Sequence, residues 1–309
     1  MARATSVADA QDALETRGLA LGFHALAGLT YLLIVLGALV RANGAGLACP
    51  DWPLCFGEVI PKFDIKIAFE WGHRALAGSV AIVFVVLAGL TLRQQQLRTK
   101  MWLGLFIAAT LLAVQIVLGG LTVLELLASW TVTSHLLTGN AFALALVLLA
   151  RRLSTLGDAS AGRSEPATAT QRRVTTLAGV LLGIQIVLGG LVASNYAGLV
   201  CPDWPTCMNG EFFPTWSGIQ GLHLFHRMFG YSCLLAIVVA AWLGRSHSGS
   251  RTWLGAGAVL ALLQVGVGVA NVLLQLPVEI TGLHSALAAG LVCTLGVSVR
   301  EAWRGGVSS

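Results

Sequence analysis

Charged residues are scarce in this sequence. Asp, Glu, Lys and Arg make up 11% of its 309 residues, whereas a soluble globular domain carries about a quarter. Hydrophobic residues account for 56%, and the mean hydropathy is +0.79. This composition excludes an ordinary soluble domain and indicates an integral membrane protein. The formal net charge of +5 is accounted for by membrane topology, so nucleic-acid binding is not indicated.

Three further absences narrow the function classes. The chain has 6 cysteines but no Cys-x-x-Cys motif, which disfavours a quinone-coupled thiol–disulfide oxidoreductase. Proline does not strongly interrupt any long apolar stretch, and no acidic residue falls near the middle of one, so a transporter is the weakest option. The first eighteen residues lack an apolar core, and we expect a short polar tail there rather than a cleaved signal peptide.

Long apolar stretches are what the sequence does contain. A helix needs roughly 20 apolar residues to cross the hydrocarbon core of a bilayer, and eight stretches reach that length. We therefore predict an all-α polytopic membrane protein with eight transmembrane helices. The predicted spans are 19–42, 67–92, 101–123, 130–150, 174–195, 219–243, 252–274 and 279–299.

The distribution of Lys and Arg predicts the orientation of these spans. Of the 19 basic residues, 14 fall in the two tails or in the connections that follow even-numbered spans. Cytoplasmic segments are enriched in Lys and Arg, so we expect both termini to be cytoplasmic. The connections after odd-numbered spans are then exterior, and the plasma membrane is the expected location.

The chain also repeats itself. The segment IVLGALVRANGAGLACPDWPLC at 34–55 matches IVLGGLVASNYAGLVCPDWPTC at 186–207, at a constant offset of 152 residues. Self-similarity of this length indicates a duplicated structural unit. We predict two pseudo-symmetric four-helix halves, 1–153 and 174–309, joined by a cytoplasmic linker at 154–173.

Each copy of the repeat places two cysteines in an exterior loop with five residues between them. Cysteine pairs in an oxidising compartment form disulfides, so we expect the bonds Cys49–Cys55 and Cys201–Cys207. Each disulfide would be either a structural staple of its loop or a redox-active pair, and the residues leave both alternatives open.

Four of the 7 histidines share a pattern, because each lies on a different even-numbered span. Each follows the exterior end of its helix by about one to two turns, which places all four at a similar depth near the extracytoplasmic side. Ionisable side chains within spans are costly and mark candidate functional sites. A lone membrane histidine is more often a hydrogen-bond partner between helices, but this arrangement favours metal ligands. The four are His73, His135, His226 and His284.

Haem suits these histidines better than zinc. Zinc would require a further cysteine or carboxylate at each site, whereas the paired cysteines are in the loops. A bis-imidazole haem requires two histidines on facing helices and an apolar slot between small residues, and glycines are frequent on these spans. Arg74 and Arg227 directly follow a histidine and are candidate contacts for haem propionates, with lipid headgroups as the alternative.

The two halves differ at one position of this pattern. Glu70 lies three residues before His73, whereas His223 lies three residues before His226. Residues three apart share a helix face, so we expect Glu70 to face the pocket of His73, where a carboxyl can carry protons. Our hypothesis is that the first half does chemistry on a bound tetrapyrrole and that the second half holds a haem cofactor.

At these residues the chain resembles the haem A synthases. The resemblance covers nearly the whole chain: the eight spans, the duplicated half, the Glu70-x-x-His73-Arg74 motif, the other three histidines and the paired loop cysteines. It implies oxidation of the C8 methyl of haem O to a formyl group through hydroxylated intermediates. The resulting haem A would serve terminal oxidases, so haem O synthase and terminal oxidase assembly are the expected partners.

The resemblance also implies a role for each residue. His73 and His135 would flank the substrate haem O, and His226 and His284 would ligate a haem b. Glu70 would assist proton movement or stabilise a cationic intermediate. Of the two cysteine pairs, Cys49 with Cys55 would be the more important for function.

A second class of function also accounts for much of the pattern. A non-enzymatic di-haem b protein that transfers electrons through the membrane would explain the four histidines equally well. It would give Glu70 no functional role, and that residue therefore distinguishes the two hypotheses.

Overall fold

The computed structural model describes residues 7–157, 167–247 and 249–304, and this part of the chain is all-helical apart from loops and turns. Eight of its helices are long and apolar enough to cross a membrane, which confirms the predicted fold class and number of spans. They are α1 (Val7–Ala42), α2 (Ile65–Arg93), α3 (Gln95–Leu124), α4 (Ser129–Gly157), α5 (Ala169–Ser194), α6 (Gly218–Gly244), α7 (Arg251–Leu273) and α8 (Val278–Arg304), with a short 3-10 helix η1 (Ala197–Leu199) after α5.

The helices extend beyond the predicted apolar stretches. α1 begins at Val7, inside the expected polar tail, because the tail contains good helix formers such as Ala, Gln, Leu and Glu. α4 continues to Gly157 and α5 begins at Ala169, so both ends of the predicted linker are helical. Residues 158–166 of that linker lie outside the described residues.

Capping residues in the loops set two of the helix starts. The Asp64 side chain accepts a hydrogen bond from the backbone N–H of Lys66, which satisfies one free donor at the start of α2. Thr168 and Gln171 form a reciprocal capping box at the start of α5. At the start of both helices, side chains thus accept hydrogen bonds from backbone N–H groups that have no partner within the helix.

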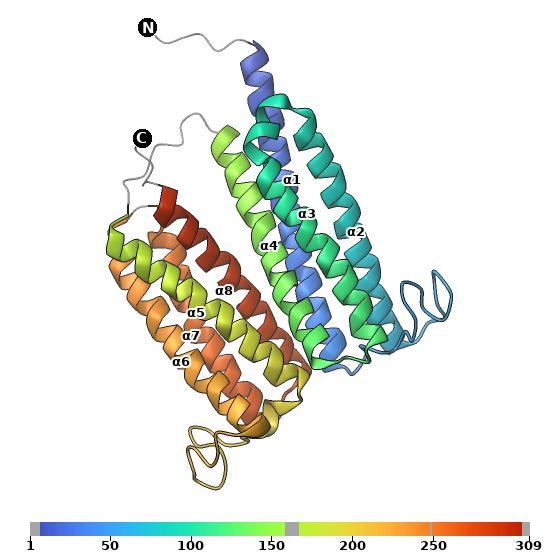
Figure 1. Ribbon diagram of the computed structural model, residues 1–309, viewed down its shortest axis with the longest axis vertical. Helices are drawn as coiled ribbons and strands as arrows, with labels where there is room; N and C mark the ends of the chain where they lie inside the picture. The colour runs from blue at the N-terminus through green and yellow to red at the C-terminus, as the bar shows by residue number, and fades with distance from the viewer. Residues whose placement is uncertain (1–6, 158–166, 248, 305–309) are drawn as a thin grey trace.

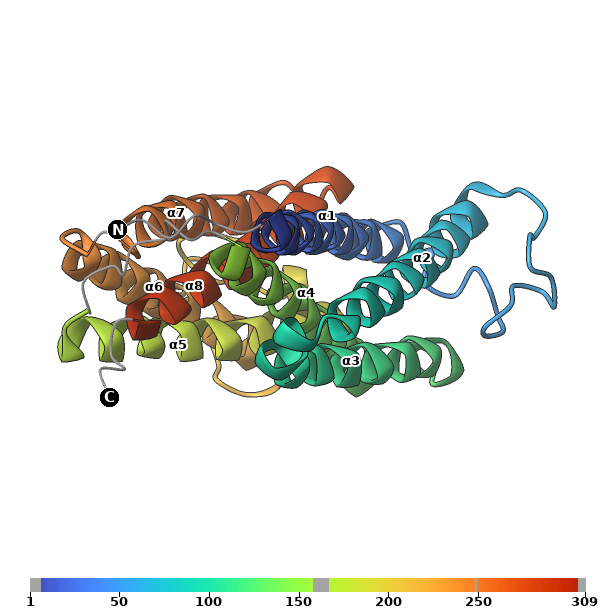
Figure 2. The same cartoon turned by 90° about the horizontal axis from the view of Figure 1, so that it is seen from above.

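The helices pack as two groups of four. α1 contacts α2 and α4, and α3 contacts α2 and α4, around a core that includes Phe23, Met101 and Leu146. α5 contacts α6 and α8, and α7 contacts the same two helices, around a core that includes Ile237 and Leu295. Figures 1 and 2 show the two groups side by side, and the contacts between them are made by α1 and α4 of the first group with α5 and α8 of the second.

Close approaches of side chains to glycine backbones join the two groups. A Cβ on Gly190 of α5 would lie 2.9 Å from Cγ2 of Thr133 on α4. The Thr133 and Ser194 hydroxyl groups are hydrogen-bonded at 3.2 Å, and the Tyr31 hydroxyl donates to the carbonyl of Ala286 on α8. Because glycine lacks a side chain, these helices can approach closely enough for such contacts.

The loops of residues 43–64 and 195–217 lie at one end of the bundle (Figure 1). The start of α1 and the end of α8 lie at the opposite end. This arrangement matches an even number of crossings in each half. The cytoplasmic location of the termini and the division into halves of separate function stay predictions.

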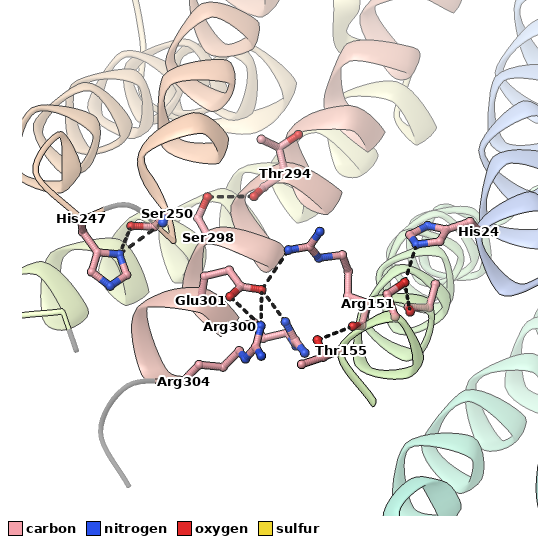
Figure 3. Close-up of polar contacts among 12 residues, drawn as sticks. His24, Arg151, Thr155, His247, Ser250, Thr294, Ser298, Arg300, Glu301 and Arg304 are labelled. Atoms are coloured by element: carbon pink, nitrogen blue, oxygen red, sulfur yellow. Dashed lines mark hydrogen bonds and ion pairs between the residues drawn. The ribbon is translucent and has the colours of Figure 1, made fainter. Parts of the chain in front are cut away.

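A buried carboxylate at the end of the bundle away from the loops also links the two groups. Glu301 on α8 is 3% exposed and forms ion pairs with Arg151 on α4 at 3.3 Å and with Arg304 at 3.1 Å. It pairs with Arg300 as well, and Figure 3 shows the three guanidinium groups converging on it. His135 and His284 are 149 residues apart, and the same offset aligns Arg151 with Arg300, so a basic residue from each half shares one acidic partner.

Glu301→Gln should therefore destabilise the fold, because three neighbouring guanidinium groups lose their common counter-charge. The expected loss is about 1–3 kcal/mol, since hydrogen bonds to charged groups have that magnitude and the arginines are partly exposed. Thermal unfolding in detergent should show a lower midpoint. Glu279→Gln, at an exposed position of the same helix, is the control. Equal midpoints for the two variants would contradict the prediction.

Candidate functional site

The four pattern histidines occupy the same packing environment in both groups of helices. Each lies on an even-numbered helix and places its ring against a glycine of the preceding odd-numbered helix. A side chain on that glycine would crowd the ring, so the missing Cβ makes room for the imidazole. A Cβ on Gly37 would lie 3.0 Å from Cε1 of His73, and the distances are 3.2 Å for Gly119 to His135, Gly189 to His226 and Gly268 to His284.

The histidines are divided into pairs between the two groups of helices. His73 and His135 lie against glycines of α1 and α3 in the first group, and His226 and His284 lie against glycines of α5 and α7 in the second. One pair therefore belongs to α2 and α4, and the other to α6 and α8. The structure therefore places two of the four histidines in each group of helices, and their pairing at a common ligand stays a prediction.

Several of these rings have a buried nitrogen without a hydrogen-bond partner among the described residues. These atoms are Nδ1 of His73, His135 and His284. A buried polar atom without a partner costs free energy, and in a native protein it requires an explanation such as a bound ligand. Paired imidazoles, unpartnered ring nitrogens and glycine-lined contacts fit a large planar group that takes one nitrogen ligand from each of two helices.

Glutamines accompany three of the four histidines, which the sequence reasoning missed. Gln115 Nε2 lies 3.3 Å from His135 Nε2, and Gln264 Nε2 lies 3.2 Å from His284 Nε2. Gln185 Nε2 lies 3.1 Å from His226 Nδ1. In each case the glutamine precedes the ring-contacting glycine by four residues, one helix turn. A glutamine within an apolar helix, four residues before a glycine, is the sequence signal that could have identified these histidine partners.

The loops of residues 43–64 and 195–217 contain the expected disulfides. Cys49 is bonded to Cys55 and Cys201 to Cys207, as predicted. In the first loop the Asp51 carboxylate accepts hydrogen bonds from the backbone N–H groups of Gly57 and Phe56, each at 2.7 Å. These donors, Gly57 foremost, hold the pKa of Asp51 below its usual value. The loop is therefore closed both covalently and by hydrogen bonds.

Arg74 fastens the first loop to α2. Its guanidinium group donates to the backbone carbonyls of Asp51 at 2.7 Å, Leu54 at 2.5 Å and Cys49 at 3.2 Å. It also forms an ion pair with Glu70 at 2.5 Å. Neither sequence-based alternative for Arg74, a propionate or a lipid headgroup, anticipated these partners. Contact between Arg74 and a haem propionate stays a prediction.

Arg227 fastens the second loop to α6 in the same way. It donates to the carbonyls of Asp203 at 3.0 Å, Thr206 at 3.1 Å and Cys201 at 2.6 Å. Its Nε donates to Nε2 of His223 at 3.1 Å. Both arginines directly follow a pattern histidine, so each loop is tied to the helix that carries the candidate ligand. A propionate contact of Arg227 likewise stays a prediction.

Glu70 and His223 have matching structural roles. Glu70 is 4% exposed, and its Oε2 accepts a hydrogen bond from the backbone N–H of Cys49 at 2.8 Å while Oε1 pairs with Arg74. His223 is 3% exposed, with Nδ1 2.8 Å from the carbonyl oxygen of Ala197 and Nε2 bonded to Arg227. The described partners of Glu70 thus lie in the loop and on Arg74. Its participation in proton movement stays a prediction.

His24 is separate from the histidine pairs. Its Nε2 lies 3.4 Å from the Ser154 hydroxyl, near Arg151 (Figure 3). It lines a cavity of about 240 Å³ together with Arg17, Ala20, Leu21 and Ser154. None of the pattern histidines lines this cavity, so it belongs to a different part of the molecule.

Comparison with known proteins points to one family. Residues 23–295 match the family described as COX15-CtaA, cytochrome oxidase assembly protein. The Heme A synthase of Shewanella oneidensis is 31% identical to the chain, over 86% of the chain and 91% of the relative. The Heme A synthase of Caulobacter vibrioides is 30% identical over 94% and 96%. That of Halalkalibacterium halodurans is 30% identical over 85% and 90%.

The contact between Gly189 and His226 can be tested directly. Gly189→Ala places a Cβ 3.2 Å from the ring and should displace it, because overpacking costs about 1–3 kcal/mol. We expect roughly tenfold weaker haem binding in the second half, measured as haem per protein after purification. Gly183→Ala is the control, since nothing lies within 4 Å of a Cβ at that position of α5. Equal haem content in the two variants would refute the proposed importance of this contact.

Proposed function

Because this chain belongs to the COX15-CtaA family of cytochrome oxidase assembly proteins, we propose that it is a haem A synthase that oxidises the C8 methyl of haem O to a formyl group through hydroxylated intermediates. The observation that carries the proposal is that each four-helix group contains two of the pattern histidines, with every ring against a glycine. Relatives named Heme A synthase cover most of the chain and support the same reaction.

The two histidine pairs take different tetrapyrroles in this proposal. His73 and His135 hold the substrate haem O, and His226 and His284 hold a haem b as cofactor. A haem b held by His226 and His284 would supply an electron carrier. The histidines would orient the two tetrapyrroles, and the packing of α4 against α5 and α8 places the two groups of helices side by side.

Each disulfide loop is bonded to the helix that carries one of the proposed ligands. Arg74 and Arg227 tie each disulfide loop to the helix turn that follows a histidine. We place the protein in the plasma membrane with both haem sites near the extracytoplasmic side, which agrees with the distribution of Lys and Arg. Haem O synthase would supply the substrate, and terminal oxidase assembly would consume the product.

A di-haem b electron-transfer protein is the second candidate, and one observation favours it. Glu70 supports its loop through Arg74 as His223 does through Arg227. Glu70 therefore has a structural role that would be needed even in a protein without catalytic activity. The names of the relatives favour the synthase. Pigment analysis distinguishes the two candidates.

The full-length protein should be produced in a host that makes haem O and purified in mild detergent. The bound pigment is then extracted and identified by chromatography and mass. We expect haem A or a hydroxylated haem O together with haem B. Haem B alone, at two equivalents per chain, would overturn the proposal and identify an electron-transfer protein.

The role of Glu70 requires a variant that keeps the loop intact. Glu70→His reproduces the arrangement of the second half, where His223 pairs with the arginine, and removes the carboxyl. We expect haem A formation to fall at least tenfold, because a proton-transferring group is lost. The backbone amides of the loop at 49–57 should stay protected from hydrogen exchange, because the loop keeps its conformation. Glu58→Gln, at an exposed position of the same loop, is the control. Full haem A formation by Glu70→His would exclude carboxyl chemistry at this position.

A further inference from the structure

The cavity between α1 and α4 is separate from the pattern histidines. It is lined by Arg17, Ala20, Leu21 and His24 of α1 and by Ser154 of α4, and its volume is about 240 Å³. One water needs roughly 15 Å³ of such space, so a considerably larger group fits. The α1 residues occupy positions i, i+3, i+4 and i+7, and they therefore share one face of the helix.

The polar side chains of the α1–α4 cavity favour an anion. Arg17 Nε donates to the last carbonyl of α4 at 3.2 Å, and the two terminal nitrogens of this guanidinium group have no partner among the described residues. His24 Nε2 lies 3.4 Å from the Ser154 hydroxyl on the facing helix (Figure 3). Guanidinium, imidazole and hydroxyl groups can all donate to phosphate oxygens. None of the described residues that line the cavity is acidic, and Glu15 accepts a hydrogen bond from Gln94 at 3.0 Å instead.

The α1–α4 cavity lies toward the end of the bundle opposite the disulfide loops (Figure 1). Between Arg17 and Arg41 the sequence of α1 contains no Asp, Glu, Lys or Arg. At a rise of 1.5 Å per residue this interval spans about 36 Å, slightly more than the hydrocarbon core of a bilayer at about 30 Å. Arg17 is therefore expected at the level of the lipid headgroups. Leu21, which is 70% exposed, offers the adjoining apolar surface to an acyl chain.

We propose that the α1–α4 cavity binds the phosphate headgroup of an anionic phospholipid, such as phosphatidylglycerol, from the leaflet on the side of the chain termini. Basic pockets between transmembrane helices on the cytoplasmic side bind headgroups of this kind. Arg17 and His24 donate to the phosphate oxygens, and an acyl chain lies along Leu21. The bound headgroup joins α1 to the end of α4 and thereby stabilises the first group of helices. This site is independent of the proposed haem chemistry.

Native mass spectrometry of the full-length protein, released from a neutral detergent, measures the binding of each lipid directly. Phosphatidylglycerol and phosphatidylcholine with the same short acyl chains are titrated separately, because they differ in net charge but not in their chains. We expect phosphatidylglycerol to bind about tenfold more tightly or better, since its net negative charge pairs with Arg17. Inorganic phosphate is the third probe. It should not displace the lipid at equal concentration, because it lacks the chains that contact Leu21.

Two kinds of variant locate the binding. Leu21→Glu places a carboxylate at the cavity without removing a polar contact, and it should weaken phosphatidylglycerol binding about tenfold. Leu14→Glu is the matched control, because Leu14 is 67% exposed on the same helix and does not line the cavity. Arg17→Gln should weaken binding by a similar factor, whereas Arg17→Lys, which keeps the charge, should retain most of it. Gel filtration confirms that each variant is folded.

Each outcome bears on the lipid site alone. If phosphatidylcholine binds as tightly as phosphatidylglycerol, or if Leu21→Glu behaves like Leu14→Glu, the inference is wrong. If inorganic phosphate displaces phosphatidylglycerol at equal concentration, the cavity takes the free ion and the assignment to a lipid is wrong. Pigment extracted from the same samples tests the proposed function separately, because none of these variants alters a pattern histidine.

Discussion

The contact between a histidine ring and a glycine on the neighbouring helix is the constraint on which the candidate sites depend. It occurs once for each of the four pattern histidines, and each time a Cβ on the glycine would lie 3.0–3.2 Å from the ring. The helices are close-packed elsewhere by Leu, Ile, Val and Phe side chains, so an imidazole fits between them only where a side chain is missing. A single small residue thus sets both the spacing of the helices and the position of the ring.

The two disulfide loops depend on these same helices. One guanidinium group, on the residue directly after a histidine, satisfies carbonyl oxygens of three loop residues in each half. Charge-assisted hydrogen bonds of this kind are stronger than neutral ones. The conformation of the disulfide loop is therefore coupled to the helix turn that carries the histidine, and a change in one would be transmitted to the other.

The two halves share the residues of the site framework and differ at some of the positions that contact it. The histidines, their glycines, the disulfides and the loop arginines occur in both halves, whereas Leu33 stands opposite Gln185 and Glu70 opposite His223. Glu301 stands at the position of Arg152 in the first half and binds arginines from both halves. Differences at such contact positions can give two sites of one architecture different ligands, while the paired helices keep both sites in place.

The sequence by itself determined the eight spans, the repeat, the disulfide pairs and the set of four histidines, because hydropathy, periodicity and spacing are properties of local sequence. It did not determine the partners of Glu70 and Arg74, the glutamine beside His226 or the arginines around Glu301. Many of those contacts join residues on different helices or in a loop and a helix, such as Arg74 with the loop carbonyls and Arg151 with Glu301. The direction of each side chain, even within a local pair such as Glu70 and Arg74, depends on how the helices and loops pack. Only the tertiary structure decided that Glu70 supports a loop, because a shared helix face brings two residues near each other without choosing their hydrogen-bond partners.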